Sequence, residues 1–269
     1  MLTTDLSSHF ATLDGMRVHY TSFGSGKEAV VFIHGWACDL TFWRLQAPVY
    51  QKQRALLLDL PGHGQSDKPD IPYTQELFAC AVEAVMRDAG VEKAVLVGHS
   101  MGTPVALTFL SRFPEKAKAL VIVDGYMPMP PGSKEEEKRR EAEAAEEIKS
   151  YRSPDYRATV GSDIDYMFTP RTAQALRDEI RSKMLSTPQH VLASALEGMR
   201  ALAPLKAKVE KPTLAIMAQQ DVSPAYEKYI WEFFPNLEIQ KWDDVGHFLM
   251  MEQPERFNRV LLDFLEKNR

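Results

Sequence analysis

The chain has few cysteines and no excess of positive charge. Its 269 residues include two cysteines, Cys38 and Cys80, which permit one disulfide but neither a disulfide framework nor a thiolate metal site. Lysine and arginine together number 32 against 37 acidic residues, which gives a net charge of −5. Nucleic acids and anionic membranes are bound by basic surfaces, so we expect neither as a partner.

Long hydrophobic runs are also missing. No apolar stretch approaches the ~18 residues that a membrane-spanning helix needs. The first residues, MLTTDLSSHFATLDG, contain no basic segment followed by an apolar core, so no signal peptide is predicted. We therefore expect no membrane span and a cytoplasmic location.

The residues that are present indicate an α/β fold. Short β-branched runs alternate with longer helical patterns, and nearly continuous apolar runs are typical of strands buried on both faces. Such runs span residues 29–35, 55–62, 93–99, 118–125 and 212–219, with an alternating run at 16–24 and a weaker one at 237–247. Helical patterns span residues 74–89, 101–113, 225–234 and 254–267. The alternation predicts a mostly parallel sheet with helices on both faces.

One segment, residues 126–205, interrupts this rhythm. It opens with the Pro-rich YMPMPPGS, continues with the charged KEEEKRREAEAAEEIKS, and contains no convincing strand. We interpret it as a helical insertion into a core formed by residues 1–125 and 206–269. The charge run is typical of a solvated helix face, because acidic and basic residues alternate at neighbouring helical positions.

The stretch AVLVGHSMGTPVAL places Ser100 where a buried strand ends and a helix begins. This context favours a nucleophile elbow, in which a strained turn lifts the serine hydroxyl above the sheet. Gly98 and Gly102 suit such a turn because neither carries a Cβ. The alternative is that Ser100 is a plain helix N-cap.

A serine nucleophile needs a base, and His247 is the best of seven histidines, because it follows the last strand pattern in a glycine-containing loop. A carboxylate should in turn orient the imidazole. Asp221 and Asp124 each follow a buried strand. Asp221 is preferred because it follows the later of the two strands, while Asp124 is interpreted as a hydrogen-bonding residue at the start of the insertion.

The oxyanion of an acyl-transfer intermediate needs two N–H donors. The amide of Met101, directly after Ser100, is one candidate. The second is the amide of Trp36 in the loop HGWACD, where Gly35 lets the backbone come close to the substrate. The Trp36 side chain either packs in the core or forms one wall of the acyl site.

These residues lie in motifs that resemble the α/β-hydrolase superfamily, in particular its serine carboxylesterase-like members with a helical cap. The motifs are HGW at 34–36, DLPGHGQSD at 59–67, GHSMG at 98–102, AQQD up to Asp221 and GH at 246–247. The resemblance implies an eight-stranded sheet, the triad Ser100, Asp221 and His247, and an oxyanion hole from the Trp36 and Met101 amides. Thr103 and Ala218 depart from it, since many members have glycine at both positions.

The resemblance and the apolar residues of the insertion together predict a hydrolase for small, fairly apolar esters, acting through an acyl-enzyme. Trp36, Tyr126, Met127 and Phe168 are the candidate substrate-binding residues. No metal or organic cofactor is expected, and the protein is expected to be a monomer or homodimer. A serine nucleophile argues against the aspartate-dependent haloalkane dehalogenases and epoxide hydrolases of this fold. Three alternatives stay open: a carbon–carbon bond hydrolase, a receptor-like binding module with slow turnover, and an acyltransferase.

Overall fold

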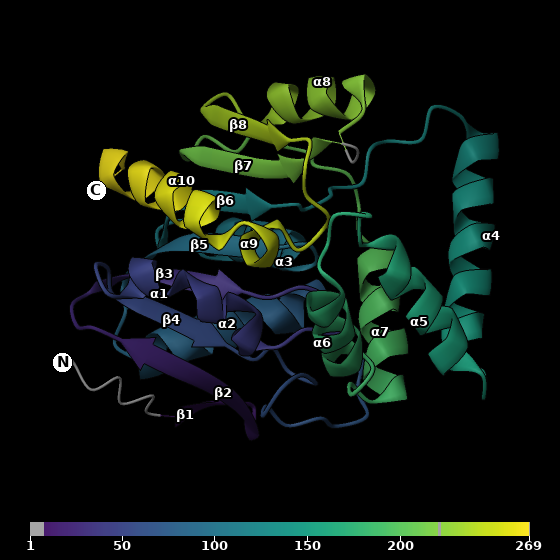
Figure 1. Ribbon diagram of the computed structural model, residues 1–269, viewed down its shortest axis with the longest axis horizontal. Coiled ribbons are helices and arrows are strands. Elements are labelled where there is room, and N and C mark those ends of the chain that lie inside the picture. Colours follow the sequence, from purple (N-terminus) through teal and green to yellow (C-terminus); the bar gives the residue numbers. More distant parts are fainter. Residues whose placement is uncertain (1–7, 220–221, 269) are drawn as a thin grey trace.

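A central sheet runs through the molecule (Figure 1). The structure is a computed structural model that describes residues 8–219 and 222–268. Within these residues the sheet has eight strands in the order β1-β2-β4-β3-β5-β6-β7-β8. Strand β2 pairs antiparallel with β1 and β4, and all other pairs are parallel. The strands are β1 Ser8–Leu13, β2 Met16–Phe23, β3 Glu28–Ile33, β4 Ala55–Leu58, β5 Lys93–His99, β6 Ala117–Val123, β7 Thr213–Ala218 and β8 Leu237–Trp242. The predicted α/β fold with a mostly parallel sheet is confirmed.

The strand pattern of the sequence located every strand except β1. The central strands β3 to β7 are buried almost throughout, which explains their continuous apolar runs. Strand β1 lies at the edge of the sheet and has one buried residue, Ala11, so it carries little hydrophobic signal.

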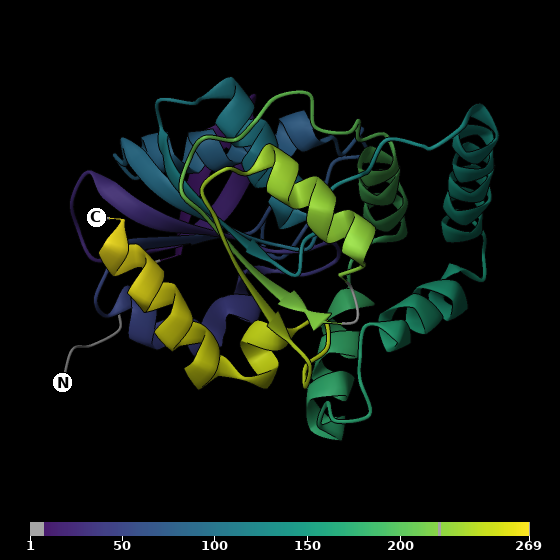
Figure 2. The ribbon, with the colours of Figure 1, turned by 90° about the horizontal axis from the view of Figure 1, so that it is seen from above.

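Helices cover both faces of the sheet. Figure 2 shows α1, α9 and α10 on one face and α2, α3 and α8 on the other. Thr74 caps α2 by accepting from the Leu77 N–H, and Ser223 caps α8 by accepting from the Tyr226 N–H. The helices are α1 Ala47–Tyr50, α2 Gln75–Asp88, α3 Gly102–Arg112, α4 Lys134–Tyr151, α5 Tyr156–Tyr166, α6 Gln174–Met184, α7 Gln189–Arg200, α8 Pro224–Phe233, α9 Leu249–Glu252 and α10 Pro254–Lys267, with a 3-10 helix at Leu40–Gln46. In the part of the chain described, no helix has both the length and the hydrophobicity needed to cross a bilayer.

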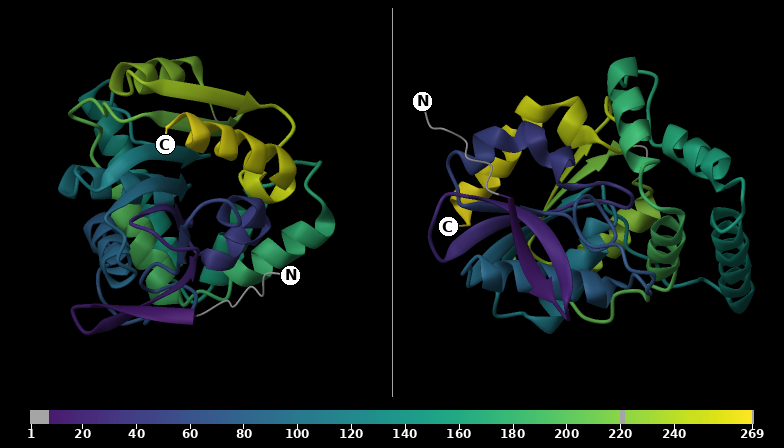
Figure 3. Two further views of the ribbon diagram at one scale, coloured as in Figure 1. Left: turned by 90° about the vertical axis from the view of Figure 1, so that its left-hand side faces the viewer. Right: turned by 90° about the horizontal axis from the view of Figure 1, so that it is seen from below.

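Residues 126–205 form the four helices α4 to α7, and this fully described segment contains no strand. They lie beyond the carboxyl ends of the parallel strands (Figure 1). Helix α4 stands at the outer edge of the molecule in Figures 2 and 3, and Tyr151 is its one buried residue. The charge run therefore forms a solvated helix, as predicted. We refer to residues 126–205 below as the helical insertion.

Candidate active site

Ser100 occupies a strained turn between β5 and α3. Its φ is +50°, a left-handed conformation that is uncommon for a residue with a side chain. A Cβ at Gly98 would clash with the Gly102 carbonyl, and one at Gly102 would clash with the Ile33 carbonyl. The two glycines are thus required by the close approach of three backbone segments, which is the packing expected of a nucleophile elbow.

The two predicted oxyanion donors flank this turn. The Met101 N–H directly follows Ser100, and Gly35 next to Trp36 is so close that an added Cβ would lie 3.1 Å from the Ser100 Cβ. Within the described residues, neither the Trp36 N–H nor the Met101 N–H has a hydrogen-bond acceptor. Both amides are therefore free to bind an anionic oxygen beside Ser100.

The imidazole of His247 is paired with Asp124. Its Nδ1 lies 2.7 Å from the Asp124 Oδ2, and the Asp124 side chain is 1% exposed against 20% for His247. The second carboxylate oxygen, Oδ1, accepts the Ala218 N–H at 2.7 Å. A carboxylate held in this way accepts the Nδ1 hydrogen and leaves the Nε2 lone pair of His247 available for another proton.

In the described part of the chain the carboxylate that pairs with His247 is that of Asp124, whereas the sequence favoured Asp221. Asp221 lies outside the described residues. Nδ1 of His247 carries a single hydrogen, however, and Asp124 is placed to accept it. Strands β6 and β7 are neighbours and end at the same edge of the sheet, so either aspartate satisfies the sequence pattern. Asp124 also departs from ordinary strand geometry, with a φ of +44°.

Ser100 and His247 open into one cavity of about 640 Å³ between the sheet and the helical insertion. Among the described residues, neither the Ser100 Oγ nor the His247 Nε2 has a hydrogen-bond partner. Catalytic hydrogen bonds are often long before substrate binds, so both atoms remain available to a reacting group. The apolar part of the lining consists of Met101, Pro104, Tyr126, Pro128, Met129, Pro131, Ala144, Leu196, Met199, Leu202 and Pro204.

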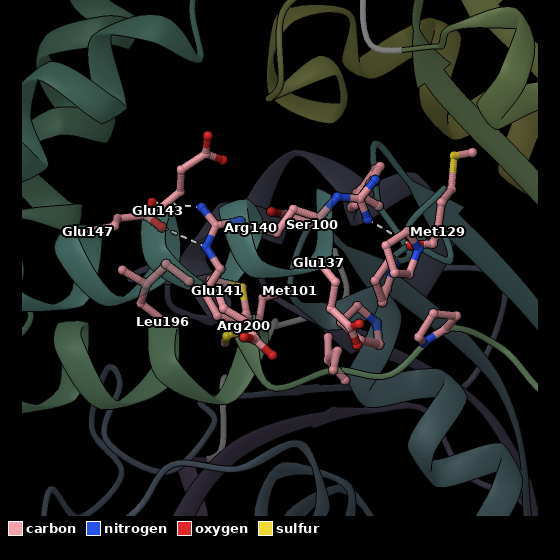
Figure 4. A pocket seen from close by; sticks show the side chains of 18 of the residues that line it. Ser100, Met101, Met129, Glu137, Arg140, Glu141, Glu143, Glu147, Leu196 and Arg200 are labelled. Carbon is pink, nitrogen blue, oxygen red and sulfur yellow. Dashed lines mark hydrogen bonds and ion pairs between the residues drawn. The ribbon is translucent and has the colours of Figure 1, made fainter. Parts of the chain in front are cut away.

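Charged side chains of α4 and α7 also line this cavity (Figure 4). Its two cations are already paired: Arg200 donates to both Glu147 oxygens, at 2.6 and 2.7 Å, and Arg140 donates to Glu136 at 2.5 Å. Within the described part of the chain, the carboxylates of Glu137 and Glu141 have no partner. The uncompensated charge in the lining is therefore negative.

Of the four predicted substrate-binding residues, Tyr126 lines this cavity, where it is 57% exposed and stacks on Tyr226. The other three lie elsewhere. The Trp36 side chain is buried and donates from Nε1 to the Leu192 carbonyl at 3.0 Å, so it fastens the insertion to the core. Met127 is buried and does not line this cavity, although both of its neighbours in the chain do, and Phe168 packs on Phe248.

The buried histidines of the glycine-containing loops act through hydrogen bonds. His99 Nε2 donates to the His247 carbonyl at 2.9 Å, and burial lowers the pKa of His99 well below its usual value. His34 Nδ1 donates to the Gly35 carbonyl at 2.8 Å while its Nε2 accepts the Leu60 N–H. Burial lowers the pKa of His63 to about 3. These rings are neutral at neutral pH, and sequence inspection did not reveal that His99 supports the main chain of the base.

The two departures from the family pattern have structural explanations. Thr103 Oγ1 donates to the Gly98 carbonyl at 3.0 Å, and Gly125 leaves room for the Thr103 side chain because a Cβ there would clash with it. The Ala218 N–H is the donor to Asp124, a contact that does not depend on the side chain.

The cysteines and other candidate ligands form no metal site in the described residues. Cys38 and Cys80 are both free thiols, and burial raises the pKa of Cys38 well above its usual value. No group of three or more His, Cys, Asp or Glu side chains within 8–219 and 222–268 is arranged to hold a metal ion.

Comparison with known proteins identifies a matching family and several similar proteins. The sequence profile of the alpha/beta hydrolase family matches residues 30–260. A 2-hydroxy-6-oxononadienedioate/2-hydroxy-6-oxononatrienedioate hydrolase of Paraburkholderia phymatum is 29% identical over an alignment that, with its gaps, is 280 positions long and covers 96% of this chain and 95% of that protein. Est816, described as an N-acyl homoserine lactone degrading enzyme, superposes with a TM-score of 0.77 at 25% sequence identity. The aligned region covers 95% of this chain and 100% of the Est816 chain. A thermophilic esterase from Thermogutta terrifontis shares the fold, with a TM-score of 0.82 at 24% identity over 97% of this chain and 98% of its own.

Proposed function

Because the chain belongs to the alpha/beta hydrolase family, we propose that it is a serine hydrolase that cleaves small, fairly apolar carboxylic esters. Ser100 is the nucleophile, His247 the general base and Asp124 the acid that orients it. The observation that carries the proposal is the pairing of His247 with the buried Asp124 beside the strained Ser100, all three of which line one cavity.

The reaction proceeds in two halves. The Ser100 Oγ attacks the ester carbonyl while His247 Nε2 takes its proton, and His247 then returns that proton to the leaving alcohol as the acyl-enzyme forms. Water, deprotonated by His247, then attacks the acyl carbon; the bond to Ser100 Oγ breaks, His247 returns the proton to that oxygen, and the carboxylic acid is released. The amides of Trp36 and Met101 bind the oxyanion in both halves, and the loss of one such donor typically costs about 2.7–4 kcal/mol of transition-state stabilisation.

A second candidate is hydrolysis of a carbon–carbon bond, which the relative from Paraburkholderia phymatum supports by its name and its 29% identity. A dienedioate carries two carboxylates, which need cationic partners. In this cavity Arg140 and Arg200 are occupied by glutamates, and Glu137 and Glu141 add unpaired negative charge. Like charge across a binding site is unfavourable, so the cavity supports neutral esters over dicarboxylates.

A substrate comparison tests this choice. The purified protein is expected to hydrolyse p-nitrophenyl butyrate at a steady rate, and to cleave a vinylogous diketone dicarboxylate at least about tenfold less efficiently by kcat/KM. A neutral diketone of the same skeleton serves as the matched control for charge. Faster cleavage of the dicarboxylate than of the ester contradicts the proposal and favours carbon–carbon bond hydrolysis.

Activity is expected to fall on acidification, because a general base that already carries a proton cannot accept the Ser100 proton. Burial keeps the pKa of His99 far below its usual value and that of His63 at about 3, so neither ring gains a proton near neutral pH. The acid limb of log(kcat/KM) should therefore approach a slope of about one. A flat profile argues against the role of His247.

Loss of the fold at low pH needs a separate control. The pKa values of His34, His63 and His99 are lowered in the folded state. Below the ordinary histidine pKa of about 6.5 the unfolded chain binds more protons than the folded one, so stability decreases as the pH falls. The circular dichroism spectrum should stay that of the folded protein at each pH of the assay, which separates loss of the active base from unfolding.

A further inference from the structure

The main chain around His247 is held by residues from three directions. The His247 N–H donates to the Met167 carbonyl of the helical insertion at 3.0 Å, and its carbonyl accepts from His99 Nε2 at 2.9 Å. The preceding amide, the Gly246 N–H, donates to the Glu252 Oε1 at 3.1 Å. The loop is tight here, since a Cβ on Gly246 would lie 2.8 Å from the Met167 carbonyl oxygen and 3.0 Å from the Glu252 Oε1.

The second oxygen of Glu252 contacts the insertion. Its Oε2 accepts the Thr172 hydroxyl at 3.1 Å, although 80 residues separate the two in the sequence. Thr172 is 5% exposed and is itself held in place, since its Oγ1 accepts the Thr169 N–H at 3.1 Å and its carbonyl accepts from Arg177 Nε at 2.9 Å. One carboxylate thus joins an ordered turn of the insertion to the loop that carries His247.

The surroundings of Glu252 argue against a direct role in substrate binding. Burial raises the pKa of Glu252, and the hydrogen bonds from Gly246 and Thr172 act against that rise. Glu252 is not among the residues that line the cavity of Ser100 and His247, so it is not placed to touch a substrate. Its contacts are with the supports of the base and not with the reacting atoms.

We infer that Glu252 is a positioning residue for His247: its carboxylate fastens the Gly246–His247 main chain to Thr172, so that the helical insertion helps to keep the imidazole aligned with Ser100 and Asp124. This inference rests on the proposed role of His247 as the general base. Misplacement of a catalytic group by about 1 Å costs up to a hundredfold in rate, so a support outside the cavity has a measurable effect.

The first test is Glu252→Leu, which keeps a similar volume and removes both hydrogen-bond acceptors. We expect kcat for p-nitrophenyl butyrate to fall about tenfold or more, with KM changed less than about threefold, because alignment and not binding is lost. Glu255→Leu is the matched control, since Glu255 is exposed at the start of α10, and it should behave like the wild type. Wild-type kcat in Glu252→Leu, or an equal loss in Glu255→Leu, overturns the inference.

The second test addresses the link to the insertion. Thr172→Val removes the hydroxyl and should lower kcat, whereas Thr172→Ser retains it and should stay near the wild-type value. In the Glu252→Leu background, Thr172→Val should cost little more, because both changes break the same connection. Fully additive losses would show that the two residues act independently and would overturn the proposed link.

A readout that needs no turnover separates this inference from the proposed function. The hydrogen between His247 Nδ1 and Asp124 should give a downfield proton resonance in the wild type and in Ser100→Ala. In Glu252→Leu that resonance should broaden or shift, while Glu255→Leu leaves it in place. If the wild type hydrolyses no ester, the proposed function fails, and this resonance still decides the positioning role: an unchanged signal in Glu252→Leu overturns it.

Discussion

Replacing Ser100 by alanine is expected to lower the turnover of a p-nitrophenyl ester by about 10⁶-fold, the loss typical of a removed serine nucleophile. The cavity, the His247–Asp124 pair and the free amides of Trp36 and Met101 all remain in this variant, but no atom is left to form the acyl-enzyme. Alanine carries a Cβ like serine, so it tolerates the φ of +50° no worse and the fold should be unchanged.

The assay is paired with covalent labelling. An alkyl phosphonate should add once to the wild-type chain, on the peptide that contains Ser100, and should leave Ser100→Ala unmodified by mass spectrometry. Circular dichroism and the unfolding temperature should match between the two proteins. Clearly measurable ester turnover in a folded Ser100→Ala protein would falsify the nucleophile assignment.

Asp124→Asn is expected to lower kcat by about 10⁴-fold, because an amide at this position favours the wrong tautomer of the base. The single oxygen of the new side-chain amide accepts either the His247 Nδ1–H or the Ala218 N–H, and the NH₂ group then faces the other donor. Asp221→Asn, by contrast, should retain most of the activity. A larger loss of kcat in Asp221→Asn than in Asp124→Asn would show that Asp221, and not Asp124, is the acid.

Comparison of the two variants requires a measure of folding, since Asp124 is buried and its substitution affects the end of β6. Thermal unfolding of Asp124→Asn provides that measure. A folded Asp124→Asn protein that still reacts slowly with the phosphonate, with its pH profile altered, is the expected outcome, because Ser100 is present but its base is misaligned.

Sequence patterns were sufficient to propose the nucleophile and the base because both depend on local features. Two glycines around Ser100 indicate a crowded turn, and His247 follows a glycine after the last strand. The acid was ambiguous for a physical reason: β6 and β7 are neighbours in the sheet, and each ends in an aspartate-containing loop. Only the three-dimensional arrangement of the His247 loop shows that Asp124 is within 2.7 Å of the ring.

The cavity wall was less predictable than the candidate reacting residues. The pattern of α4 correctly indicated a solvated helix, but periodicity does not show that Glu137 and Glu141 also face the cavity of Ser100. The Trp36 side chain illustrates the same limit, since its partner, the Leu192 carbonyl, is 156 residues away in the chain. Contacts of this range depend on how the helical insertion packs, which no local pattern encodes.

The hydrogen bond from the Ala218 N–H to Asp124 has a consequence for how this protein tolerates change. With Asp124 as the acid, the carboxylate directly follows β6 and accepts a hydrogen bond from the last residue of β7, so the loop after β7 does not carry it. Insertions and deletions in that loop can then accumulate, by natural drift or by engineering, without displacing the acid.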